Sequence, residues 1–267
     1  MCIRDRPLID PTFSDHSHGF RPGRRAHDAV REVKAYVETG YSWVVDLDLE
    51  KFFDRVNHDV LMDRVSKLVD DNLVLLLIRR YLQSGIMVDG LRVVSEQGVP
   101  QGGPLSPLLA NILLDDWDKE LERRGLRFVR YADDCNIFVR TKHAGKRVFK
   151  SITCFLANRL RLQVNRKKSA VGRPWTRPFL GFTVSRTTEG LRLRVSSKSV
   201  KRFRNHVRSM MKRARGNSLN DTVLELNRFL RGWFGYFGIA GVYRTFCLLY
   251  TSPSPRDLST SRMPSSA

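Results

Sequence analysis

The sequence predicts an α+β protein in which helices pack on antiparallel strands. Of its 267 residues, 42% are hydrophobic, which is enough for a packed core. Short β-rich runs joined by turn residues alternate with longer runs of helical periodicity, and no internal repeat is present. The longest apolar run, residues 73–78, is far shorter than the roughly 18 residues of a membrane span. We therefore expect one or two soluble globular domains.

The N-terminal half predicts a strand, two helices, a hairpin and a third helix. Residues 43–47 (WVVDL) form a β-rich run that leads into acidic residues, and residues 59–68 and 72–82 have helical periodicity. Residues 86–94 (IMVDGLRVV) predict a hairpin, because Asp-Gly favours the tight turn between two strands. After the Gly/Pro-rich stretch VPQGGPLSP, apolar residues recur at near-helical spacing up to Trp117.

The C-terminal half predicts two hairpins and two helices. Residues 127–139 (RFVRYADDCNIFV) predict a hairpin whose turn consists of two adjacent carboxylates, Asp133 and Asp134. A helix over residues 142–160 precedes a hairpin within residues 179–195. Residues 197–215 predict a serine-capped amphipathic helix with one strongly basic face.

The charge of the chain indicates a polyanionic partner. The formal net charge is +20, yet residues 7–140 carry 18 basic and 22 acidic side chains, whereas residues 141–246 carry 25 and 3. Aromatic residues are interleaved with the second group, which favours nucleic-acid binding over a merely solvated basic surface. The four cysteines show no CxxC pairing and no histidine at metal-ligand spacing. We therefore expect neither disulfides nor a zinc site, and a cytoplasmic protein.

Three carboxylates follow predicted strands and are candidates for a metal site. Asp48 follows the strand over residues 43–47, and Asp133 and Asp134 form the expected hairpin tip. Two adjacent aspartates between apolar neighbours repel each other unless a cation neutralises them. Two Mg²⁺ ions held by such carboxylates also suit phosphoryl transfer. The pair taken alone is equally explained by the preference of aspartate for tight turns.

The order of the motifs resembles the palm of a reverse transcriptase, in the group II intron-encoded branch. The motifs, in chain order, are GFRPGRRAHDAV (19–30), WVVDLDLEKFFD (43–54), QGGPLSPLLANILL (101–114), RYADD (130–134), LQVNRKKS (162–169) and FLGF (179–182). A further segment, LNRFLRGWFGYF (226–237), resembles the maturase region of that family. The resemblance implies a right-hand polymerase with partial fingers, an antiparallel palm, a helical thumb and the start of an α-helical maturase domain.

The resemblance implies catalytic and metal-binding roles for residues that match the motifs. Asp48 takes the place of the first catalytic aspartate, six residues before Asp54 of the FFD triplet, with Asp46 as the alternative. Asp133 would bind metal directly and Asp134 would support it. The backbone carbonyl of Leu49 would complete a site for two Mg²⁺ ions, or for Mn²⁺.

Other residues would contact the nucleotide. The resemblance makes Phe53 a gate that disfavours a 2′-hydroxyl, although plain core packing is the alternative for this ring. Gln101 and Gly102 would let the backbone approach the nucleotide closely. Lys168 would lie near the triphosphate leaving group, with its neighbours Arg166 and Lys167 as alternatives.

The nucleic-acid contacts implied by the resemblance are basic side chains in two regions. Arg21 and Arg24 of the GFRPGRR segment would lie near the template. The basic face of the predicted thumb helix would follow the phosphates of an RNA/DNA hybrid. Its members are Lys201, Arg202, Arg204, Arg208, Lys212 and Arg213. The aromatic residues at 233, 234, 236 and 237 are favoured as core over a base-stacking surface.

The function implied is RNA-directed DNA polymerisation with a maturase role in intron splicing and mobility. The partners would be an RNA template, a DNA primer, dNTPs and the group II intron RNA. A retron, diversity-generating or defence-associated reverse transcriptase is one alternative, and an RNA-binding maturase without polymerase activity is another. The maturase-like segment argues against the first alternative, and the intact aspartates argue against the second.

The resemblance also predicts domain boundaries and artefactual ends. Partial fingers are expected over residues 7–40, the palm with fingers insertions over 41–195, the thumb helix over 196–217 and the truncated maturase region over 218–246. Residues 1–6 (MCIRDR) and 247–267 resemble translated sequencing adapter. Because the upstream basic fingers motifs of the family are not seen, we expect impaired polymerase activity.

Overall fold

The structure is a computed structural model that describes residues 9–84, 86–88, 91–93, 97–100, 102–188, 190–213 and 218–241. The chain divides into two compact units, Met1–Leu180 and Gly181–Ala267, which are treated separately below. No helix among the described residues is both long enough and apolar enough to cross a membrane.

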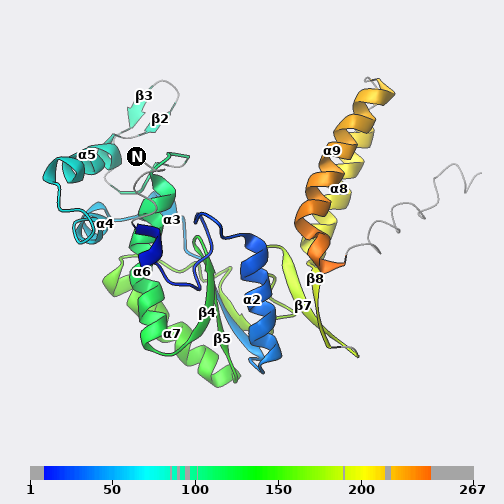
Figure 1. Cartoon of the computed structure of the whole chain (residues 1–267), viewed down its shortest axis with the longest axis horizontal. Helices are drawn as coiled ribbons and strands as arrows, with labels where there is room; N and C mark the ends of the chain where they lie inside the picture. Colours follow the sequence, from blue (N-terminus) through cyan, green and yellow to red (C-terminus); the bar gives the residue numbers. More distant parts are fainter. Residues whose placement is uncertain are drawn as a thin grey trace, which may run out of the picture. The chain divides into compact units, whose positions relative to one another are not determined.

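A four-stranded antiparallel sheet in the order β4-β5-β1-β6 organises the first unit (Figure 1). The strands are β1 (Trp43–Leu47), β4 (Arg127–Tyr131), β5 (Asp134–Val139) and β6 (Ala170–Gly172). β1 lies between β5 and β6, with Leu47 paired to Cys135 and Val45 paired to Val171. A separate hairpin consists of β2 (Ile86–Val88) and β3 (Leu91–Val93), as predicted, and its turn residues lie outside the described residues.

Helices of the first unit cover the sheet and the segments between its strands. Their bounds are η1 (Asp10–Thr12), α2 (Ala26–Glu38), α3 (Phe52–Arg55), α4 (His58–Val65), α5 (Asn72–Gln83), α6 (Ser106–Arg123) and α7 (Lys142–Arg159). Side chains cap several of them: Asn57 accepts the Val60 N–H of α4, and Thr141 accepts the Ala144 N–H of α7. These caps explain where the two helices begin.

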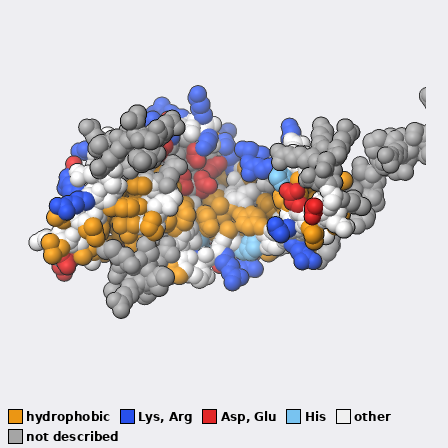
Figure 2. Space-filling model, turned by 90° about the horizontal axis from the view of Figure 1, so that it is seen from above, with side chains coloured by type: hydrophobic (Ala, Val, Ile, Leu, Met, Phe, Trp, Pro, Cys, Tyr) orange, Lys and Arg blue, Asp and Glu red, His pale blue; other side chains and the backbone are white. Residues whose placement is uncertain are grey.

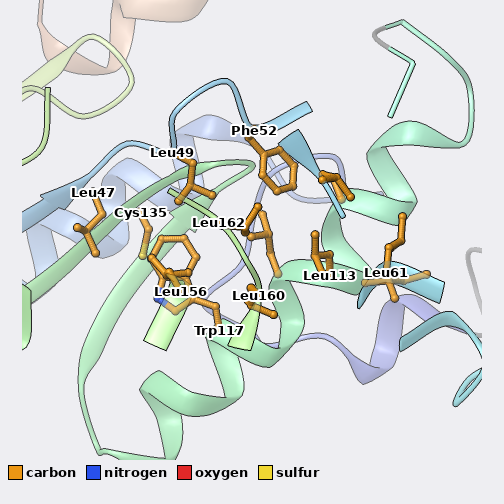
Figure 3. Packing of buried hydrophobic residues seen from close by; sticks show 14 of the residues in the cluster. Leu47, Leu49, Phe52, Leu61, Leu113, Trp117, Cys135, Leu156, Leu160 and Leu162 are labelled. Atoms are coloured by element: carbon orange, nitrogen blue, oxygen red, sulfur yellow. The ribbon is translucent and has the colours of Figure 1, made fainter. Parts of the chain in front are cut away.

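The alternation of side chains along β1 gives the sheet two different faces. Val45 and Leu47 point into the main apolar core, where they join Trp117 of α6 and Leu156 of α7 (Figure 3). Val44 is also buried but belongs to the opposite face, against which α2 places its own buried residues. Asp46 shares this opposite face by alternation, so the acidic residues of β1 lie away from the main core.

Several elements differ from the sequence prediction. The helix α2, the short helix α3 and the three-residue edge strand β6 were not predicted. The turn between β4 and β5 consists of Ala132 and Asp133, and Asp134 is already the first residue of β5. The prediction that both carboxylates form the turn was therefore wrong for Asp134, because Asp134 pairs with Tyr131 in the ladder.

The second unit is a hairpin followed by two helices. It contains β7 (Phe182–Thr187), β8 (Gly190–Val195), α8 (Ser197–Arg213), α9 (Leu219–Phe237) and η3 (Gly238–Ala240). The ring of Phe203 on α8 lies 4.3 Å from that of Trp233 on α9, and Phe182 lies 5.0 Å from Phe237. The prediction that the aromatic run near residue 233 forms core holds for the buried Phe237, while Trp233 and Tyr236 are half-buried and Phe234 is 40% exposed. The β7–β8 hairpin thus groups with the helices of this unit.

Candidate active site

The sheet register brings the three predicted carboxylates together. Leu47 pairs with Cys135, so extending this register by one residue sets Asp48 beside Asp134. The adjoining turn adds Asp133 next to Asp134. Asp46 pairs with Asn136 one step further along the ladder. Residues that are about 85 positions apart in the chain therefore meet at one end of β1.

Burial and mutual repulsion raise the pKa values of these acids. Burial raises the pKa of Asp134 to about 6, and the charges of Asp133 and Asp48 contribute to the rise. The pKa of Asp133 is raised mainly by burial and also by the charge of Asp48. Burial likewise raises the pKa of Asp46 to about 6. The Arg177 guanidinium, which lies 3.7 Å from the Asp46 carboxylate, opposes this rise. The cluster is an unfavourable concentration of negative charge.

Lys168 provides a cation for this cluster. Its Nζ lies 3.1 Å from Oδ2 of Asp48, and its side chain is 68% exposed. Hydrogen bonding to Asp48 and the charge of that carboxylate raise the pKa of Lys168, with smaller effects of Asp134 and Asp133. Viewed from above, acidic side chains gather in a cluster with basic side chains beside it (Figure 2).

Two residues that the sequence analysis did not select hold Asp48 and Lys168 in place. The Ser169 hydroxyl accepts the Asp48 N–H at 2.9 Å and donates to the Asp48 carbonyl at 3.3 Å. The Asn165 side chain accepts the Lys167 and Lys168 N–H groups, which shapes the turn before Ser169. Ser169 and Asn165 stand within the LQVNRKKS motif, which was their only signal in the sequence.

The backbone carbonyl of Leu49 takes no part in the hydrogen bonds of the β-bridge that this residue forms. Leu49 forms an isolated antiparallel bridge with Val164. The hydrogen bonds of this bridge come from the flanking residues, from Asn165 N–H to the Asp48 carbonyl and from Glu50 N–H to the Gln163 carbonyl. The bridge therefore leaves the Leu49 backbone carbonyl for another partner.

The donor set fits a hard divalent cation such as Mg²⁺. Such ions prefer carboxylate and carbonyl oxygens, which Asp48, Asp133 and Leu49 supply. A divalent charge would also relieve the repulsion that raises the carboxylate pKa values. Within the described residues, no group of three or more His, Cys, Asp or Glu side chains is already arranged to hold a metal.

The turn that carries Asp133 rests on a buried polar network. Arg130 donates to the Ala132 carbonyl at 2.8 Å and to Asn111 Oδ1 at 3.1 Å. Asn111 in turn donates to the Gly19 carbonyl at 3.0 Å. A Cβ on Gly19 would lie 2.1 Å from the Ala132 nitrogen, so only glycine allows this close approach to the turn. The GFRPG segment thus packs against the turn between β4 and β5.

The Gly-rich loop begins next to α3, the short helix that carries Phe53. Phe53 packs at the edge of the core, with its ring 5.1 Å from Phe52 and 6.4 Å from Phe20. Its carbonyl accepts the Val99 N–H, which fixes the start of the loop to α3. Gly102 has a φ of +81°, and a Cβ there would meet no atom within 4 Å. The space next to Gly102 is therefore open, while Gln101 lies outside the described residues.

Arg21 does not have the role predicted from the sequence. Its side chain is 3% exposed, and it donates to both carboxylate oxygens of Asp10, at 3.0 and 3.2 Å. It also donates to the backbone carbonyls of Ser14 and Ser17. A buried guanidinium with these partners holds the N-terminal segment together and does not face a template. Arg24 is partly exposed and pairs with Asp15 at 2.5 Å.

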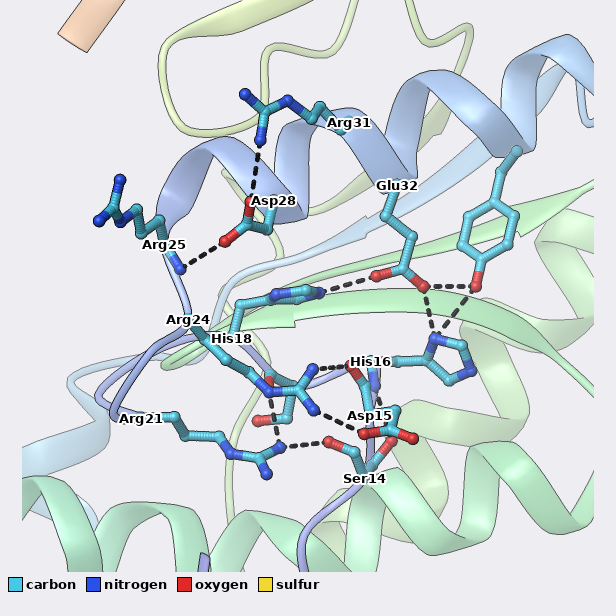
Figure 4. A network of polar contacts seen from close by, with 12 residues as sticks. Ser14, Asp15, His16, His18, Arg21, Arg24, Arg25, Asp28, Arg31 and Glu32 are labelled. Carbon is cyan, nitrogen blue, oxygen red and sulfur yellow. Dashed lines mark hydrogen bonds and ion pairs between the residues drawn. The ribbon is translucent and has the colours of Figure 1, made fainter. Parts of the chain in front are cut away.

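The same segment contains a histidine network that the sequence analysis did not find (Figure 4). His16 and His18 both bond to the Glu32 carboxylate of α2, the second at 2.7 Å, and Tyr36 donates to it at 2.6 Å. Burial opposes ionisation of Glu32, but these hydrogen bonds lower its pKa to about 2. The hydrogen bond to Glu32 raises the pKa of His16. The network ties the chain beside β4 to α2.

The basic face of α8 is solvent-exposed, as the periodicity predicts. Phe203 and Met210 are buried on the opposite face of the helix. Of the predicted basic residues, Lys201, Arg202, Arg204 and Arg208 are exposed, and Lys198 in the first turn of the helix is exposed as well. Lys212 and Arg213 belong to the helix, but their side chains lie outside the described part of the structure.

Comparisons with known proteins identify the family. Residues 3–184 match the family described as reverse transcriptase (RNA-dependent DNA polymerase). The chain belongs to the reverse transcriptase family. Residues 200–251 match the maturase-specific domain of group II introns, which places this reverse transcriptase in the predicted group II intron-encoded branch. This second match favours that branch over retron, diversity-generating or defence-associated enzymes.

Curated relatives of this reverse transcriptase match part of its length. Protein YkfC of Escherichia coli is 38% identical over 130 residues, which cover 47% of this chain and 34% of YkfC. Group II intron-encoded protein LtrA of Lactococcus lactis is 36% identical over 123 residues, which cover 46% of this chain and 20% of LtrA. The matched regions are therefore a third or less of these relatives.

Solved structures confirm the fold class of the reverse transcriptase chain. A telomerase from Candida albicans, determined in complex with a TWJ fragment of telomeric RNA, aligns with a TM-score of 0.57 and 14% identity. The alignment covers 94% of this chain and 47% of the telomerase. A similar structure from Candida tropicalis has a TM-score of 0.54. At these identities the likeness concerns the α+β polymerase fold alone.

Proposed function

We propose that this reverse transcriptase chain catalyses RNA-directed DNA synthesis, with Asp48, Asp133 and Asp134 as its catalytic carboxylates. The observation that carries the proposal is the convergence of these three side chains at one end of β1, with Lys168 beside them. A structural turn explains a pair of aspartates. It does not explain a third carboxylate and a lysine that meet them from two other segments.

The proposed reaction is attack of a primer 3′-hydroxyl on the α-phosphate of a dNTP, with pyrophosphate as the leaving group. Two divalent ions, Mg²⁺ or Mn²⁺, held by Asp48, Asp133 and the Leu49 carbonyl would stabilise the attacking and leaving oxygens. Asp134 would support Asp133 by adding negative charge next to it. Lys168, whose ammonium group is exposed beside the carboxylates, would contact the departing phosphates.

The nucleotide would lie between α3 and the Gly-rich loop. Phe53 stands at the edge of the core, where its ring would limit space around the sugar 2′ position. Gly102 would let the loop backbone approach the base pair, because the surrounding space is open. We retain Gln101 in this set on the strength of its motif alone.

The second unit would hold the nucleic acid and support an intron maturase role. The exposed basic side chains of α8 at positions 201, 202, 204 and 208 are suited to phosphate contacts along a helix, with Lys212 and Arg213 continuing the series. Arg24 is retained as a candidate template contact, whereas Arg21 is not. The match to the maturase-specific domain supports intron RNA as a second partner. Maturase activity without polymerisation is the competing function.

Primer extension on poly(rA)/oligo(dT) tests the proposal. We expect Mg²⁺-dependent synthesis by the 267-residue chain, at the reduced rate that the sequence analysis predicts, and its complete loss in Asp133→Ala. Asp70→Ala removes an exposed aspartate of another segment and is the matched control. Mn²⁺ binding, followed by electron paramagnetic resonance, provides a second readout that does not require turnover. Extension that survives Asp133→Ala would refute the catalytic assignment, as would unchanged Mn²⁺ binding in that variant.

A further inference from the structure

An exposed tryptophan stands in a rigid turn that the proposed chemistry does not use. Trp175 is 43% exposed and lies in the turn that follows β6. Three groups donate to the Arg173 carbonyl and close this turn: the Thr176 N–H at 2.9 Å, the Thr176 hydroxyl at 2.9 Å and the Arg177 N–H at 3.1 Å. A large aromatic ring on a well-ordered turn offers an accessible flat face to a planar ligand.

The guanidinium of Arg173 packs against the Trp175 ring. The Arg173 guanidinium lies 5.3 Å from the centre of the Trp175 ring and 4.2 Å from that of Trp43, so it sits in contact with both. Arg173 also donates to the Ser42 carbonyl at 3.0 Å, which fixes it to the start of β1. Lys142 adds a second cation, 5.6 Å from the Trp43 ring. We call Trp43, Lys142, Arg173 and Trp175 the Trp43–Trp175 strip.

The turn is also tied to the carboxylate cluster. Arg177 donates to the Lys168 carbonyl at 3.2 Å, and its guanidinium lies 3.7 Å from the Asp46 carboxylate. The strip and the carboxylates lie at opposite ends of β1. Asp48 follows Trp43 by five positions, so the two ends are roughly 16 Å apart along the strand. That distance equals about four or five nucleotides of a stacked strand.

The positive charge around the Trp43–Trp175 strip indicates a negatively charged binding partner. Residues 160–188 contain seven Lys or Arg and no Asp or Glu. Cations next to an exposed aromatic ring suit a nucleic-acid strand, because phosphates bind the cations while a base stacks on the ring. A base within a duplex already has both faces covered, so the ring needs an unpaired base. An acidic protein partner would be drawn by the same cations but would gain nothing from aromatic stacking.

We propose that Trp175 is a stacking site for an unpaired base of a single-stranded RNA segment, four or five nucleotides from the catalytic carboxylates. Arg173 positions the ring and adds a phosphate contact. The inference rests on the proposed function in one respect, namely that this chain binds an RNA template. It adds a binding site at the far end of the sheet.

Equilibrium binding of the 267-residue chain to two fluorescent RNA/DNA hybrids tests this site. One hybrid has a single-stranded RNA overhang, and the other is blunt. Trp175→Ala is expected to weaken binding of the overhang hybrid about five- to 150-fold and to leave the blunt hybrid unchanged. Trp175→Phe should retain most of the affinity, whereas Trp175→Leu should not, since leucine is apolar but cannot stack. Thermal melts of the variants confirm that each remains folded.

Salt dependence separates the roles of the two residues. Trp175→Ala should leave the slope of log affinity against log salt unchanged, because the ring releases no counterions. Arg173→Ala should lower the slope by about one. Arg147→Ala, which removes an exposed arginine of α7, is the matched control for charge.

Four results would overturn the stacking site. Two of them concern Trp175→Ala, namely an equal loss of affinity for both hybrids or no loss of affinity for either. The third is wild-type affinity for the overhang hybrid in Trp175→Leu. The fourth is a Trp175→Ala protein that loses self-association but keeps its RNA affinity, which would assign the ring to a protein contact. Wild-type protein that binds neither hybrid would refute the proposed function together with this site. Wild-type binding that Trp175→Ala leaves unchanged would refute this site alone.

Discussion

The buried ion pair between Arg130 and Asp118 should be a principal determinant of stability in the first unit. Both side chains are 0% exposed. Arg130 donates to the two carboxylate oxygens at 2.7 and 2.6 Å, and its remaining bonds go to Asn111 and the Ala132 carbonyl. Burial by itself would lower the pKa of Arg130, but the Asp118 carboxylate outweighs this effect and raises it. We therefore expect Arg130 to stay charged in the core.

Replacing Asp118 with asparagine removes the charge and keeps the shape. One of the two oxygens becomes an NH₂ group that faces a guanidinium donor, so at least one charge-assisted hydrogen bond is lost, at roughly 1.5–3 kcal/mol. The guanidinium is also left as an uncompensated buried charge. Together these effects give about 3–5 kcal/mol for Asp118→Asn, the usual range for removing one partner of a buried pair.

Urea unfolding followed by tryptophan fluorescence and circular dichroism measures this loss. Trp117 is adjacent to Asp118 on α6 and is fully buried, so its emission reports on this core. The midpoint of Asp118→Asn should fall by roughly 1–2 M urea. The double variant Arg130→Met/Asp118→Leu removes both charges and should be more stable than the single variant. A loss below about 1 kcal/mol, or a double variant less stable than Asp118→Asn, would refute this reasoning.

Three further predictions concern the N-terminal segment and the carboxylates. Gly19→Ala places a Cβ 2.1 Å from the Ala132 nitrogen, so it should lower the free energy of unfolding by roughly 1–3 kcal/mol. It should also lower kcat in primer extension more than it changes template affinity. An unchanged kcat would count against the contact. Glu32→Gln should destabilise the protein by roughly 1–3 kcal/mol between pH 4.5 and 6.5, and by less at pH 8.5. The lowered pKa of Glu32 contributes stability at pH values above its unfolded value of 4.5. The raised pKa of His16 contributes stability that is lost as the pH rises above 6.5. Equal losses in urea titrations at both pH values would contradict that coupling. Asp134→Asn should abolish extension. It should nevertheless stabilise the metal-free chain by about 1 kcal/mol after solvent screening, because burial and neighbouring carboxylates raise the pKa of Asp134 to about 6. A less stable variant would argue against the cluster.

The strands that carry the carboxylates could be predicted because their patterns are local. WVVDL and RFVRY are β-rich runs, and the acids that follow them interrupt an apolar pattern. The motif order then supplied the pairing of these strands, which periodicity alone cannot provide. The same local reasoning missed the edge strand β6, because three residues are too few to show alternation.

The residues that hold the site in place could not be predicted in this way, because their roles depend on contacts between distant segments. Ser169 bonds to the backbone of Asp48, 121 positions away, and Asn111 bonds to Gly19, 92 positions away. Arg21 shows the opposite error. The basic GFRPGRR motif predicts Arg21 as a template contact, whereas in the structure Arg21 is buried and bonds to Asp10 and nearby backbone carbonyls.

The β4–β5 hairpin combines an unfavourable element with a stabilising one. Its turn presents Asp133 and Asp134 next to Asp48, and the raised pKa values show that this charge costs stability. The adjacent strand places Arg130 under the same turn, where it binds the Ala132 carbonyl and the Asp118 carboxylate. A turn under electrostatic strain would otherwise move to separate its charges. The buried pair holds the Ala132 carbonyl of this turn in place, which gives Asp133 a defined backbone position next to Asp48 and Asp134.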